Sequence, residues 1–431
     1  MSDAHVPDKG ERSWWNRLDL ALIGLLFGAL VLRVLWVLFL HGPTTKTYPD
    51  MIAYDRMARL FLDSGTIAFK QPHVPTAFYM PGYPLFVAAV YWLVGSFFDQ
   101  QVAVHVVQAV LSVVTLFIVY RIGLRVCNRK VALVAVAMGA LYPPFAMANN
   151  VILTEMLFTL ALCLLALAAV RLLDTPSWRG AALFGALLAL CCYIRPVAVL
   201  WGVVPFLFLL RKVPLRRLAL LGGLGLVVFA LVMSPWWVRN AKVFDRFVVF
   251  NTSSANPLLV GTYYGLPGGK GIPSRVFDLW ASSPQEELTM NAEWQSWALQ
   301  RLRDQLKTQP MNVVKQRYQL TKTALTWPFD LIIWQIPRWA KTASIAAQEI
   351  LTILALIGFA FNYRNSRSWL LFSLFAYFVV AHAVILILNR YLFPLMPVIL
   401  LLAAYGALTL LERVRELSSF LASKVPCGSA W

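Results

Sequence analysis

The sequence predicts an all-α polytopic membrane protein with about ten transmembrane helices. Of its 431 residues, 59% are hydrophobic and only 13% are charged, whereas soluble domains carry about a quarter charged residues. Apolar runs of about 15 to 23 residues recur between residues 18 and 411. Such runs suit membrane-spanning helices and are too long for the alternating strands of an outer-membrane barrel. The composition therefore excludes an ordinary soluble domain and a disordered chain.

Ten apolar segments are expected to cross the membrane. A further apolar stretch, 83–98, follows the turn Pro81-Gly82-Tyr83-Pro84 and is expected to lie at the outer membrane face or to dip into it. Two of the ten segments are short and are separated at Arg195-Pro196. The ten predicted spans are 18–40, 102–123, 132–149, 153–173, 180–194, 196–210, 218–237, 344–361, 369–388 and 391–411.

The basic residues indicate how these spans are oriented. Lys and Arg number 38 against 20 Asp and Glu, but many lie in short loops, where they mark the cytoplasmic side rather than a nucleic-acid partner. With ten spans, 18 basic residues fall on that side, while the short external turns hold only Arg195 and Arg390. If 83–98 crossed, 15 of the 18 would move outside. The segment is therefore predicted not to cross.

This orientation divides the chain into five parts. Within the second external loop, residues 285–308 have acidic residues early and basic residues late, which favours a polar helix on the surface. The five cysteines lie outside the two long polar loops, so no disulfide framework is expected there. The parts are a cytoplasmic tail (1–17), a transmembrane module (18–237) with the first external loop (41–101), a second external loop (238–343), C-terminal transmembrane helices (344–411) and a cytoplasmic tail (412–431).

Asp50 is the first candidate for chemistry. It follows Pro49, a natural start for a short helix on which Asp50 would be the capping residue. Apolar residues then recur at helical spacing, so this helix can rest on the membrane with a carboxylate at its leading end. Asp50 is either a functional carboxylate or merely a helix cap. Asp55, on the same helix, is expected to be a surface charge beside Arg56 or Arg59.

Tyr79 and Glu155 are the next candidates on the external side. Tyr79 precedes the rigid proline turn and could hydrogen-bond a ligand, although aromatic residues at a membrane face also serve as interface anchors. Glu155 lies at the outer end of its span, and ionisable residues within a membrane are costly and usually functional. The alternative for Glu155 is a structural hydrogen bond to a neighbouring helix.

Three arginines share the external side with these residues. Arg195 and Arg390 each lie in a tight external turn, and Arg239 ends its helix on the same side. Any one of them could anchor the protein at the interface, but together they favour an anionic ligand such as a lipid phosphate. A fourth arginine, Arg33, lies within the first span and is expected only to extend outward to the membrane surface.

Taken together, the sequence resembles the C-type superfamily of glycosyltransferases that use lipid-phosphate-linked sugars. This superfamily includes dolichyl-phosphate-mannose protein mannosyltransferases and bacterial aminoarabinose transferases. The resemblance covers essentially the whole chain. It rests on four places: Pro49-Asp50 to Ala58, Tyr79-Met80-Pro81-Gly82-Tyr83-Pro84-Leu85, Leu153-Thr154-Glu155 and Asn389-Arg390-Tyr391-Leu392-Phe393-Pro394.

The resemblance implies a role for several of these residues. Asp50 matches the acidic residue that family members use as catalytic base, Glu155 matches a second acidic position, and Arg390 matches the cation that meets the lipid phosphate. Arg195 or Arg239 would assist Arg390, and Tyr79 and Tyr391 are expected to contribute to substrate binding. Two departures are notable. Met51 follows Asp50 where many members have an acidic pair, and Leu85 and Phe86 stand where the aminoarabinose branch carries a lysine.

The expected activity is inverting transfer of a sugar from a polyprenyl phosphate, such as undecaprenyl phosphate, to a hydroxyl of a lipid, glycan or protein. The reaction would take place at the periplasmic or external face of a bacterial inner membrane. No cofactor is certain, but Asp50 and Glu155 could hold a divalent cation. The alternative is a lipid-linked sugar flippase or transporter, which would use the same arginines to hold phosphate without needing a base at Asp50.

Overall fold

The computed structural model describes residues 19–39, 49–263, 281–328 and 338–424, and this part of the chain folds into helices joined by short connections. The elements, in chain order, are α1 (Leu20–Phe39), α2 (Pro49–Ser64), α3 (Gly82–Val94), α4 (Gln100–Val126), α5 (Arg129–Leu141), α6 (Pro143–Asn149), α7 (Glu155–Asp174), α8 (Trp178–Ile194), η2 (Pro196–Ala198), η3 (Leu200–Val203), α9 (Val204–Leu209), α10 (Leu215–Phe244), α11 (Ala255–Gly261), α12 (Pro284–Thr308), α13 (Pro310–Thr326), α14 (Arg338–Phe361), α15 (Ser366–Ile385), α16 (Asn389–Leu392), η5 (Phe393–Leu395) and α17 (Met396–Lys424).

The all-α polytopic membrane fold is confirmed. Within the described residues, seven helices are long and apolar enough to cross a membrane, and an eighth span is possible if α5 and α6, bent by 57°, are counted as one. Each of the ten predicted segments is helical, but two of them correspond to the shorter apolar helices Trp178–Ile194 and Pro196–Leu209. A 17-residue helix such as α8 is only about 25 Å long. The count of ten complete spans is therefore not established.

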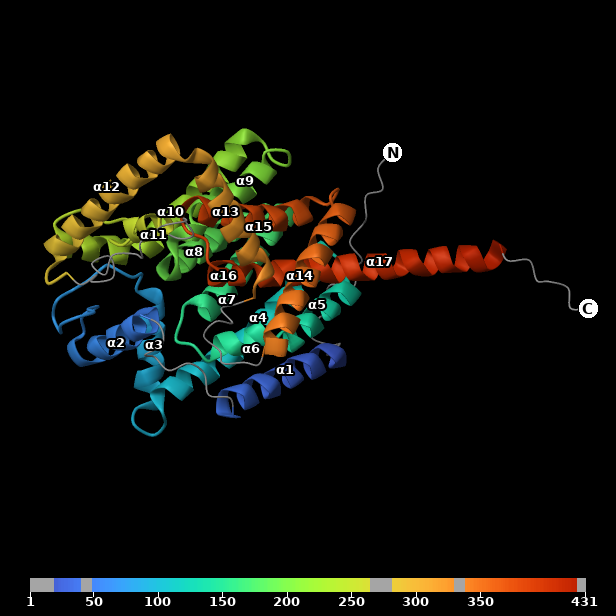
Figure 1. Ribbon diagram of the computed structural model, residues 1–431, viewed down its shortest axis with the longest axis horizontal. Helices are drawn as coiled ribbons and strands as arrows, with labels where there is room; N and C mark the ends of the chain where they lie inside the picture. The colour runs from blue at the N-terminus through green and yellow to red at the C-terminus, as the bar shows by residue number, and fades with distance from the viewer. Residues whose placement is uncertain (1–18, 40–48, 264–280, 329–337, 425–431) are drawn as a thin grey trace, which may run out of the picture.

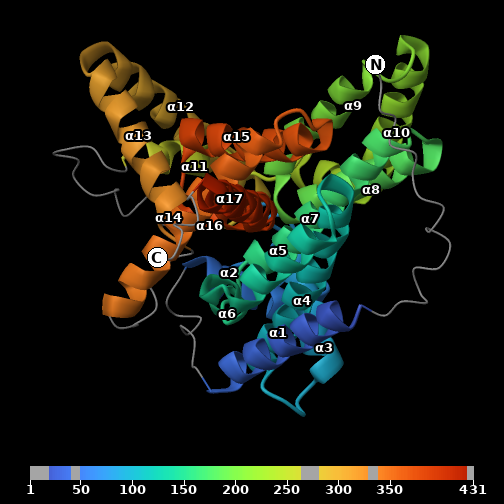
Figure 2. The ribbon, with the colours of Figure 1, turned by 90° about the vertical axis from the view of Figure 1, so that its right-hand side faces the viewer.

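The helices form an elongated body with its polar helices gathered at one end. In Figure 1, α2, α11 and α12 lie at the left end, and α17 projects to the right beyond the other helices. Figure 2, viewed from the side toward which α17 projects, shows α17 end-on near the centre. Three groups of helices spread from it: α12 to α14, α8 to α10, and α1 to α4. The predicted surface helix at 285–308 is confirmed as α12, which Ser283 caps by accepting a hydrogen bond from the backbone of Glu286.

The loops predicted to be cytoplasmic meet at the end opposite α2 and α12. Arg129, the first residue of α5, pairs with Asp19 before α1 at 2.9 Å. Asp174, at the end of α7, pairs with Arg125 at 3.1 Å and with Arg367 at 2.6 Å. Because α1 begins where α4 ends, the chain passes through the body once in each direction between them. This is the arrangement expected if α3 does not cross.

Two close backbone contacts explain glycines in these helices. A Cβ atom on Gly82, the first residue of α3, would lie 2.6 Å from the carbonyl oxygen of Tyr193 at the end of α8. A Cβ atom on Gly185 of α8 would lie 2.1 Å from the carbonyl oxygen of Gly225 in α10. Only a residue without a side chain permits these approaches. Both contacts hold α8 in place, and α8 ends at Arg195.

The prediction for Arg33 is wrong. Its side chain is fully buried in the body and does not extend to the membrane surface. Its guanidinium group donates to Ser112 Oγ at 2.8 Å and to the carbonyl oxygens of Gly139 and Ala140 at 2.9 and 3.3 Å. These carbonyls lie at the C-terminal end of α5, where Pro143 interrupts the helix. Arg33 therefore satisfies backbone acceptors that the bend would otherwise leave unpaired inside the membrane.

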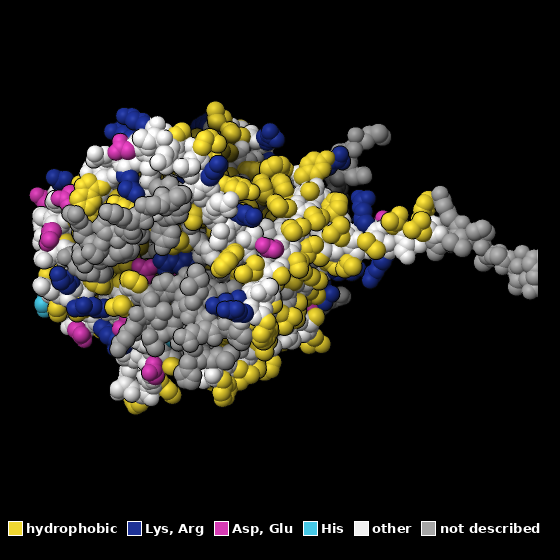
Figure 3. All heavy atoms as spheres, in the orientation of Figure 1, with side chains coloured by type: hydrophobic (Ala, Val, Ile, Leu, Met, Phe, Trp, Pro, Cys, Tyr) yellow, Lys and Arg dark blue, Asp and Glu magenta, His cyan; other side chains and the backbone are white. Residues whose placement is uncertain are grey.

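The molecular surface follows the same division. Figure 3 shows hydrophobic side chains spread over the middle of the body and charged side chains over the end at which α2 and α12 lie. The exposed hydrophobic residues include Phe27 of α1 at 67%, Leu231 of α10 at 65% and Val380 of α15 at 61%. Such exposure is expected of helices that face lipid. The apolar middle therefore faces the bilayer, and the polar end lies outside it.

Candidate active site

The first feature of the site is an ion pair between the two ends of the chain. Arg390 Nη2 donates to Asp50 Oδ2 at 2.6 Å, and the hydroxyl of Tyr79 donates to Asp50 Oδ1 at 2.9 Å. The Arg390 side chain is 12% exposed and that of Asp50 is 26% exposed. The pair therefore lies at the edge of the body, where a ligand can still reach it.

The capping prediction for Asp50 is not supported. The helix α2 begins at Pro49, so Asp50 lies inside its first turn and not before it. Both carboxylate oxygens bind side chains from other elements, Tyr79 and Arg390. Asp55, by contrast, pairs with Arg59 at 3.1 Å as predicted and also accepts a hydrogen bond from Tyr91 at 2.6 Å. The two carboxylates of α2 thus have separate environments.

A second ion pair lies on α7 and α8. Arg195 Nη2 donates to Glu155 Oε1 at 2.7 Å, and Arg195 Nε donates to Thr154 Oγ1 at 2.6 Å. Glu155 is fully buried and Arg195 is 18% exposed. Pro196 ends α8 directly after Arg195, because a proline cannot continue the hydrogen bonding of the helix. The arginine is thereby held at the break between α8 and the following 3₁₀ turn.

Tyr391 joins the two pairs. Its ring lies 5.5 Å from the guanidinium carbon of Arg195 and 5.4 Å from that of Arg390. Both distances allow a cation–π interaction. The chain reaches this position through an extended segment, 386–388, which separates α15 from α16. Two cations and two carboxylates therefore meet around one aromatic ring.

Tyrosines form the wall beside Asp50. Tyr54 lies one helical turn after Asp50 on α2, and its ring packs edge-on against Tyr79 and Tyr83, with both centroid distances at 5.0 Å. Burial raises the pKa of Tyr54 and Tyr79 above the usual value, and the negative charge of Asp50 acts in the same direction. These hydroxyls therefore stay protonated at neutral pH, and Tyr79 remains a hydrogen-bond donor to Asp50.

Asp50 itself is held in the ionised form. Burial acts to raise its pKa, but the charge of Arg390 and the hydrogen bonds from Arg390 and Tyr79 outweigh burial, with a further contribution from Arg195. The pKa of Asp50 therefore lies below its ordinary value. A carboxylate in this state accepts a proton readily only after the arginine has found another partner.

The structure brings together six of the seven predicted site residues, which are Asp50, Tyr79, Glu155, Arg195, Arg390 and Tyr391. Arg239 does not join them. Its guanidinium group donates to Ile67 O at 3.3 Å and to Asn240 Oδ1 at 2.8 Å, and it lies over the Trp236 ring. Arg239 thus fixes the first external loop to the end of α10.

Sequence reasoning missed three residues of this cluster. Tyr54 could have been found from its spacing, because residues four apart share one face of a helix and Asp50 precedes it by four. Thr154 belongs to the motif Leu153-Thr154-Glu155, but its hydrogen bond to Arg195 was not predicted. His382 of α15, whose ring lies 5.2 Å from that of Tyr391, follows from tertiary packing alone.

The carboxylates of the cluster do not fit a shared divalent cation as they stand. Asp50 binds Arg390 and Glu155 binds Arg195, so a cation between them would have to displace two guanidinium groups. Among the residues that the structure describes, no group of three or more His, Cys, Asp or Glu side chains lies close enough to hold a metal ion. The two carboxylates are therefore arranged to pair with two arginines and not to share a cation.

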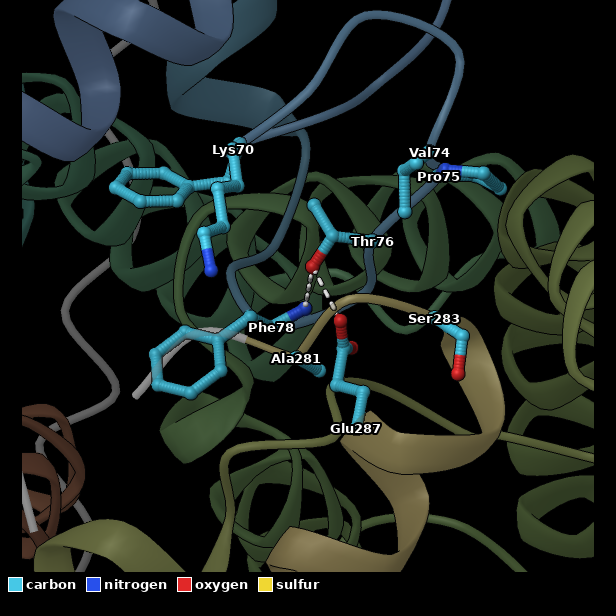
Figure 4. Close-up of a pocket in the computed structure, with 9 residues that line it drawn as sticks. Lys70, Val74, Pro75, Thr76, Phe78, Ala281, Ser283 and Glu287 are labelled. Atoms are coloured by element: carbon cyan, nitrogen blue, oxygen red, sulfur yellow. Dashed lines mark hydrogen bonds between the residues drawn. The ribbon is translucent and has the colours of Figure 1, made fainter. Parts of the chain in front are cut away.

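A small pocket lies on the other side of the segment that carries Tyr79. Figure 4 shows its lining residues, with Lys70 on one side, Glu287 on the other and Phe78 between them. The Phe78 ring packs against Tyr79 at 4.9 Å, so the 76–79 segment separates this pocket from Asp50. The segment thus has the pocket on one side and the ion pairs on the other.

Part of this chain matches one family of known proteins. Residues 79–238 match the family described as dolichyl-phosphate-mannose-protein mannosyltransferase. No curated protein gives a significant match.

Three solved structures match this chain, two of them with a TM-score above 0.5. The apo crystal structure of an oligosaccharyltransferase from Archaeoglobus fulgidus matches with TM-score 0.52 and 11% identity, over 95% of this chain and 52% of that one. AglB from the same organism, in complex with an inhibitory peptide and a dolichol-phosphate, matches with TM-score 0.51 and 11% identity, over 97% and 53%. ArnT from Cupriavidus metallidurans, bound to undecaprenyl phosphate, matches with TM-score 0.43 and 15% identity, over 90% and 78%.

The chain spans about half the length of the archaeal oligosaccharyltransferases it matches. The matched regions nevertheless cover 95% and 97% of this chain. The family match covers α3 to α10, which include the Glu155–Arg195 pair, and its first residue is Tyr79. The family match thus covers one part of this chain, and the similarity in fold to the two archaeal oligosaccharyltransferases extends over nearly all of it.

Proposed function

We propose that this protein transfers a sugar from a polyprenyl phosphate to an acceptor hydroxyl, with inversion at the anomeric carbon. The observation that carries this proposal is the Asp50 carboxylate, held between the Tyr79 hydroxyl and the Arg390 guanidinium group, with Arg195 as a second cation nearby. A base alone would not need the two arginines, and a phosphate site alone would not need the carboxylate. The family match and the dolichol-phosphate bound by AglB support a lipid phosphate as the donor.

The donor phosphate would take the place of Asp50 as the partner of Arg390. A guanidinium group binds a phosphate through charge-assisted hydrogen bonds as readily as a carboxylate. Asp50 would then have one oxygen free, while Tyr79 still holds the other. The exchange of partners would raise the proton affinity of Asp50 at the moment when the donor is in place. Donor binding would thus activate the base.

In the chemical step, the acceptor oxygen attacks the anomeric carbon on the face opposite the phosphate. Asp50 takes the proton of the acceptor hydroxyl, the new C–O bond forms, and the bond between the anomeric carbon and the phosphate oxygen breaks. Polyprenyl phosphate leaves with the electron pair of that bond. A positioned general base contributes about 10²- to 10⁴-fold to such a step. Arg390 and Arg195 would stabilise the charge that develops on the leaving phosphate.

The remaining residues would hold this machinery in place. Tyr79 orients Asp50, and Glu155 orients Arg195 together with Thr154. The Tyr391 ring, which lies against both guanidinium groups, would hold them in position. The predicted phosphate contact of Arg239 stays a prediction, because the hydrogen bonds of its guanidinium group go to Ile67 and Asn240.

We place the reaction at the periplasmic or external face of a bacterial inner membrane. The basis is the concentration of basic residues in the loops that meet at the opposite end, around Asp19, Arg129 and Asp174. The division into a catalytic module (18–237), a second external loop (238–343) and C-terminal helices (344–411) forms part of the proposal. The last group contributes Arg390, so the catalytic unit would combine the first and the last of these parts.

The test is an assay of the purified protein with a synthetic undecaprenyl-phosphate sugar and a pool of extracted lipid, glycan and protein acceptors. We expect sugar transfer with inversion of the anomeric configuration, which NMR of the product reports. If the protein moves the lipid across vesicle membranes and transfers no sugar from any such donor, it is a flippase and the proposed activity is wrong.

A further inference from the structure

Glu287 is a buried carboxylate in the second external region, far in sequence from the charged cluster. It lies in the first turn of α12 and is only 5% exposed. Both of its oxygens accept hydrogen bonds. Oε2 binds the hydroxyl of Thr76 at 2.6 Å, and Oε1 binds the backbone amide of Ala77 at 3.0 Å and the hydroxyl of Thr252.

These hydrogen bonds fix the segment that leads to Tyr79. Figure 4 shows Thr76 as the centre of this arrangement, since its hydroxyl oxygen donates to Glu287 and accepts from the amide of Phe78 at 3.0 Å. The adjacent loop completes it: the amide of Thr252 donates to Ala77 O at 3.0 Å, and the hydroxyl of Ser253 donates to Phe78 O at 2.6 Å. The next residue in the chain is Tyr79, which donates to Asp50.

Burying a carboxylate costs free energy unless hydrogen bonds or nearby charges compensate. Burial raises the pKa of Glu287, while the hydrogen bonds from Thr252, Thr76 and Ala77 and the charge of Arg239 act in the opposite direction. An apolar side chain of similar size would avoid the cost of burying a charge. It could not, however, hold three donors that come from two different loops.

We propose that Glu287 is a positioning residue. It fixes the position of the 76–79 segment and thereby places the Tyr79 hydroxyl within hydrogen-bond distance of Asp50. The inference rests on the proposed function, because it gives Tyr79 the task of orienting the base. Misplacement of a catalytic group by about 1 Å can cost about 100-fold in rate.

Glu287→Gln is the variant that tests this, with Glu293→Gln as its control. Gln keeps the size of Glu but replaces one acceptor oxygen with an NH₂ group, so one of the two hydroxyls loses its acceptor. Glu293 lies on the same helix with its side chain exposed. With the synthetic undecaprenyl-phosphate sugar, we expect Glu287→Gln to lower kcat about 10- to 100-fold with little change in donor KM. Glu293→Gln should behave as the wild type.

A double-mutant cycle with Tyr79→Phe separates positioning from general stabilisation. If Glu287 acts through Tyr79, adding Glu287→Gln to Tyr79→Phe should lower kcat by less than about threefold more. If the two losses multiply in full, Glu287 acts independently of Tyr79 and the inference is wrong. Should Glu287→Gln accumulate poorly, Thr252→Val removes one donor and keeps the carboxylate, and kcat should fall about 3- to 10-fold.

Hydrogen exchange gives a second measurement, which does not require activity. The amide of Ala77 donates to Glu287 and that of Phe78 to Thr76, so we expect both to exchange about tenfold faster in Glu287→Gln. Unchanged exchange together with unchanged kcat would overturn the inference. If the wild-type protein transfers no sugar while the exchange increases, the proposed function fails and Glu287 is the anchor of this segment alone. In that case its role in catalysis falls with the activity.

Discussion

The carboxylate of Asp50 and the guanidinium group of Arg390 lie 2.6 Å apart, although 340 positions separate them in the chain. The pair brings the start of α2 against the short helix α16. Without a ligand, each residue neutralises the charge of the other. In the proposed mechanism a donor phosphate would replace Asp50 as the partner of Arg390, so binding of the donor and release of the base would be a single event.

Asp50→Asn should leave the fold intact and lower turnover by at least about 100-fold. Asn keeps the size of Asp and can still accept a hydrogen bond from Tyr79, but it is not basic. Kinetics with the synthetic donor measure the loss, and a thermal unfolding curve in detergent shows that the protein is folded. Asp55→Asn is the matched control on the same helix and should retain near-normal turnover, because Asp55 pairs with Arg59 away from the cluster. Full activity of Asp50→Asn would show that another group is the base.

Arg390→Ala should impair use of the donor more than use of the acceptor. A charge-assisted hydrogen bond is worth about 1.5 to 3 kcal/mol, which corresponds to roughly a 10- to 150-fold change in apparent donor affinity or turnover. Initial rates at varied donor concentration measure this effect. Arg239→Ala is the informative comparison: its guanidinium group binds Ile67 and Asn240. If Arg239 also contacts the phosphate, its substitution will weaken binding of the donor to a similar degree. If it does not, the dependence of the rate on donor concentration will stay close to that of the wild type.

The pH dependence of stability should show the Asp50–Arg390 pair directly. The pKa of Asp50 in the folded protein lies below its ordinary value, because Arg390 and Tyr79 stabilise the carboxylate. A lowered pKa contributes stability above the unfolded pKa, and this stability is lost as the pH falls through the folded pKa. The difference in Tm between the wild type and Asp50→Asn should therefore be constant from about pH 5 to 8 and should shrink below about pH 4. A difference that changes between pH 5 and 8 would mean that the pKa is not lowered.

Labelling from outside the cell tests the orientation. In a background without native cysteines, Lys130→Cys in the first turn of α5 should be protected from a membrane-impermeant thiol reagent, and so should Lys212→Cys before α10. Gln285→Cys on α12 should be labelled. All three side chains are exposed, so access to the reagent depends on the side of the membrane. Labelling of Lys130→Cys would mean that α3 crosses, and the proposed external site would have to be redrawn.

Local patterns were sufficient to predict most of the helices. Apolar runs marked α1, α4 and α7 to within a few residues, and the charge order marked α12. These features depend on the side chains of one segment and its surroundings, so the sequence carries them directly. The number of complete spans was less certain, because α8 and α9 are shorter than a bilayer requires and packing decides how they sit.

The candidate site was predictable only where the topology brought charges to one side. Asp50, Glu155, Arg195 and Arg390 were selected because they share the external end of the molecule, and the structure pairs them. Glu287 was not selected, since the fold alone brings it to Thr76, 211 positions away.

Arg33 shows the same limit of sequence reasoning. The sequence shows an arginine in a span, but it does not show that α5 ends beside it and offers free carbonyl oxygens.

The distance in sequence between Asp50 and Arg390 also has a consequence for how the protein is made. At about 5 to 20 residues per second, a ribosome needs roughly 17 to 70 seconds to add 340 residues. Throughout this interval Asp50 is outside the membrane without its arginine, whereas Glu155 and Arg195, 40 positions apart, can pair early. The charge of Asp50 is neutralised only when α16 arrives with the last helices. Completion of the proposed catalytic centre would therefore be coupled to insertion of the C-terminal segment, and chains halted before residue 390 should lack activity.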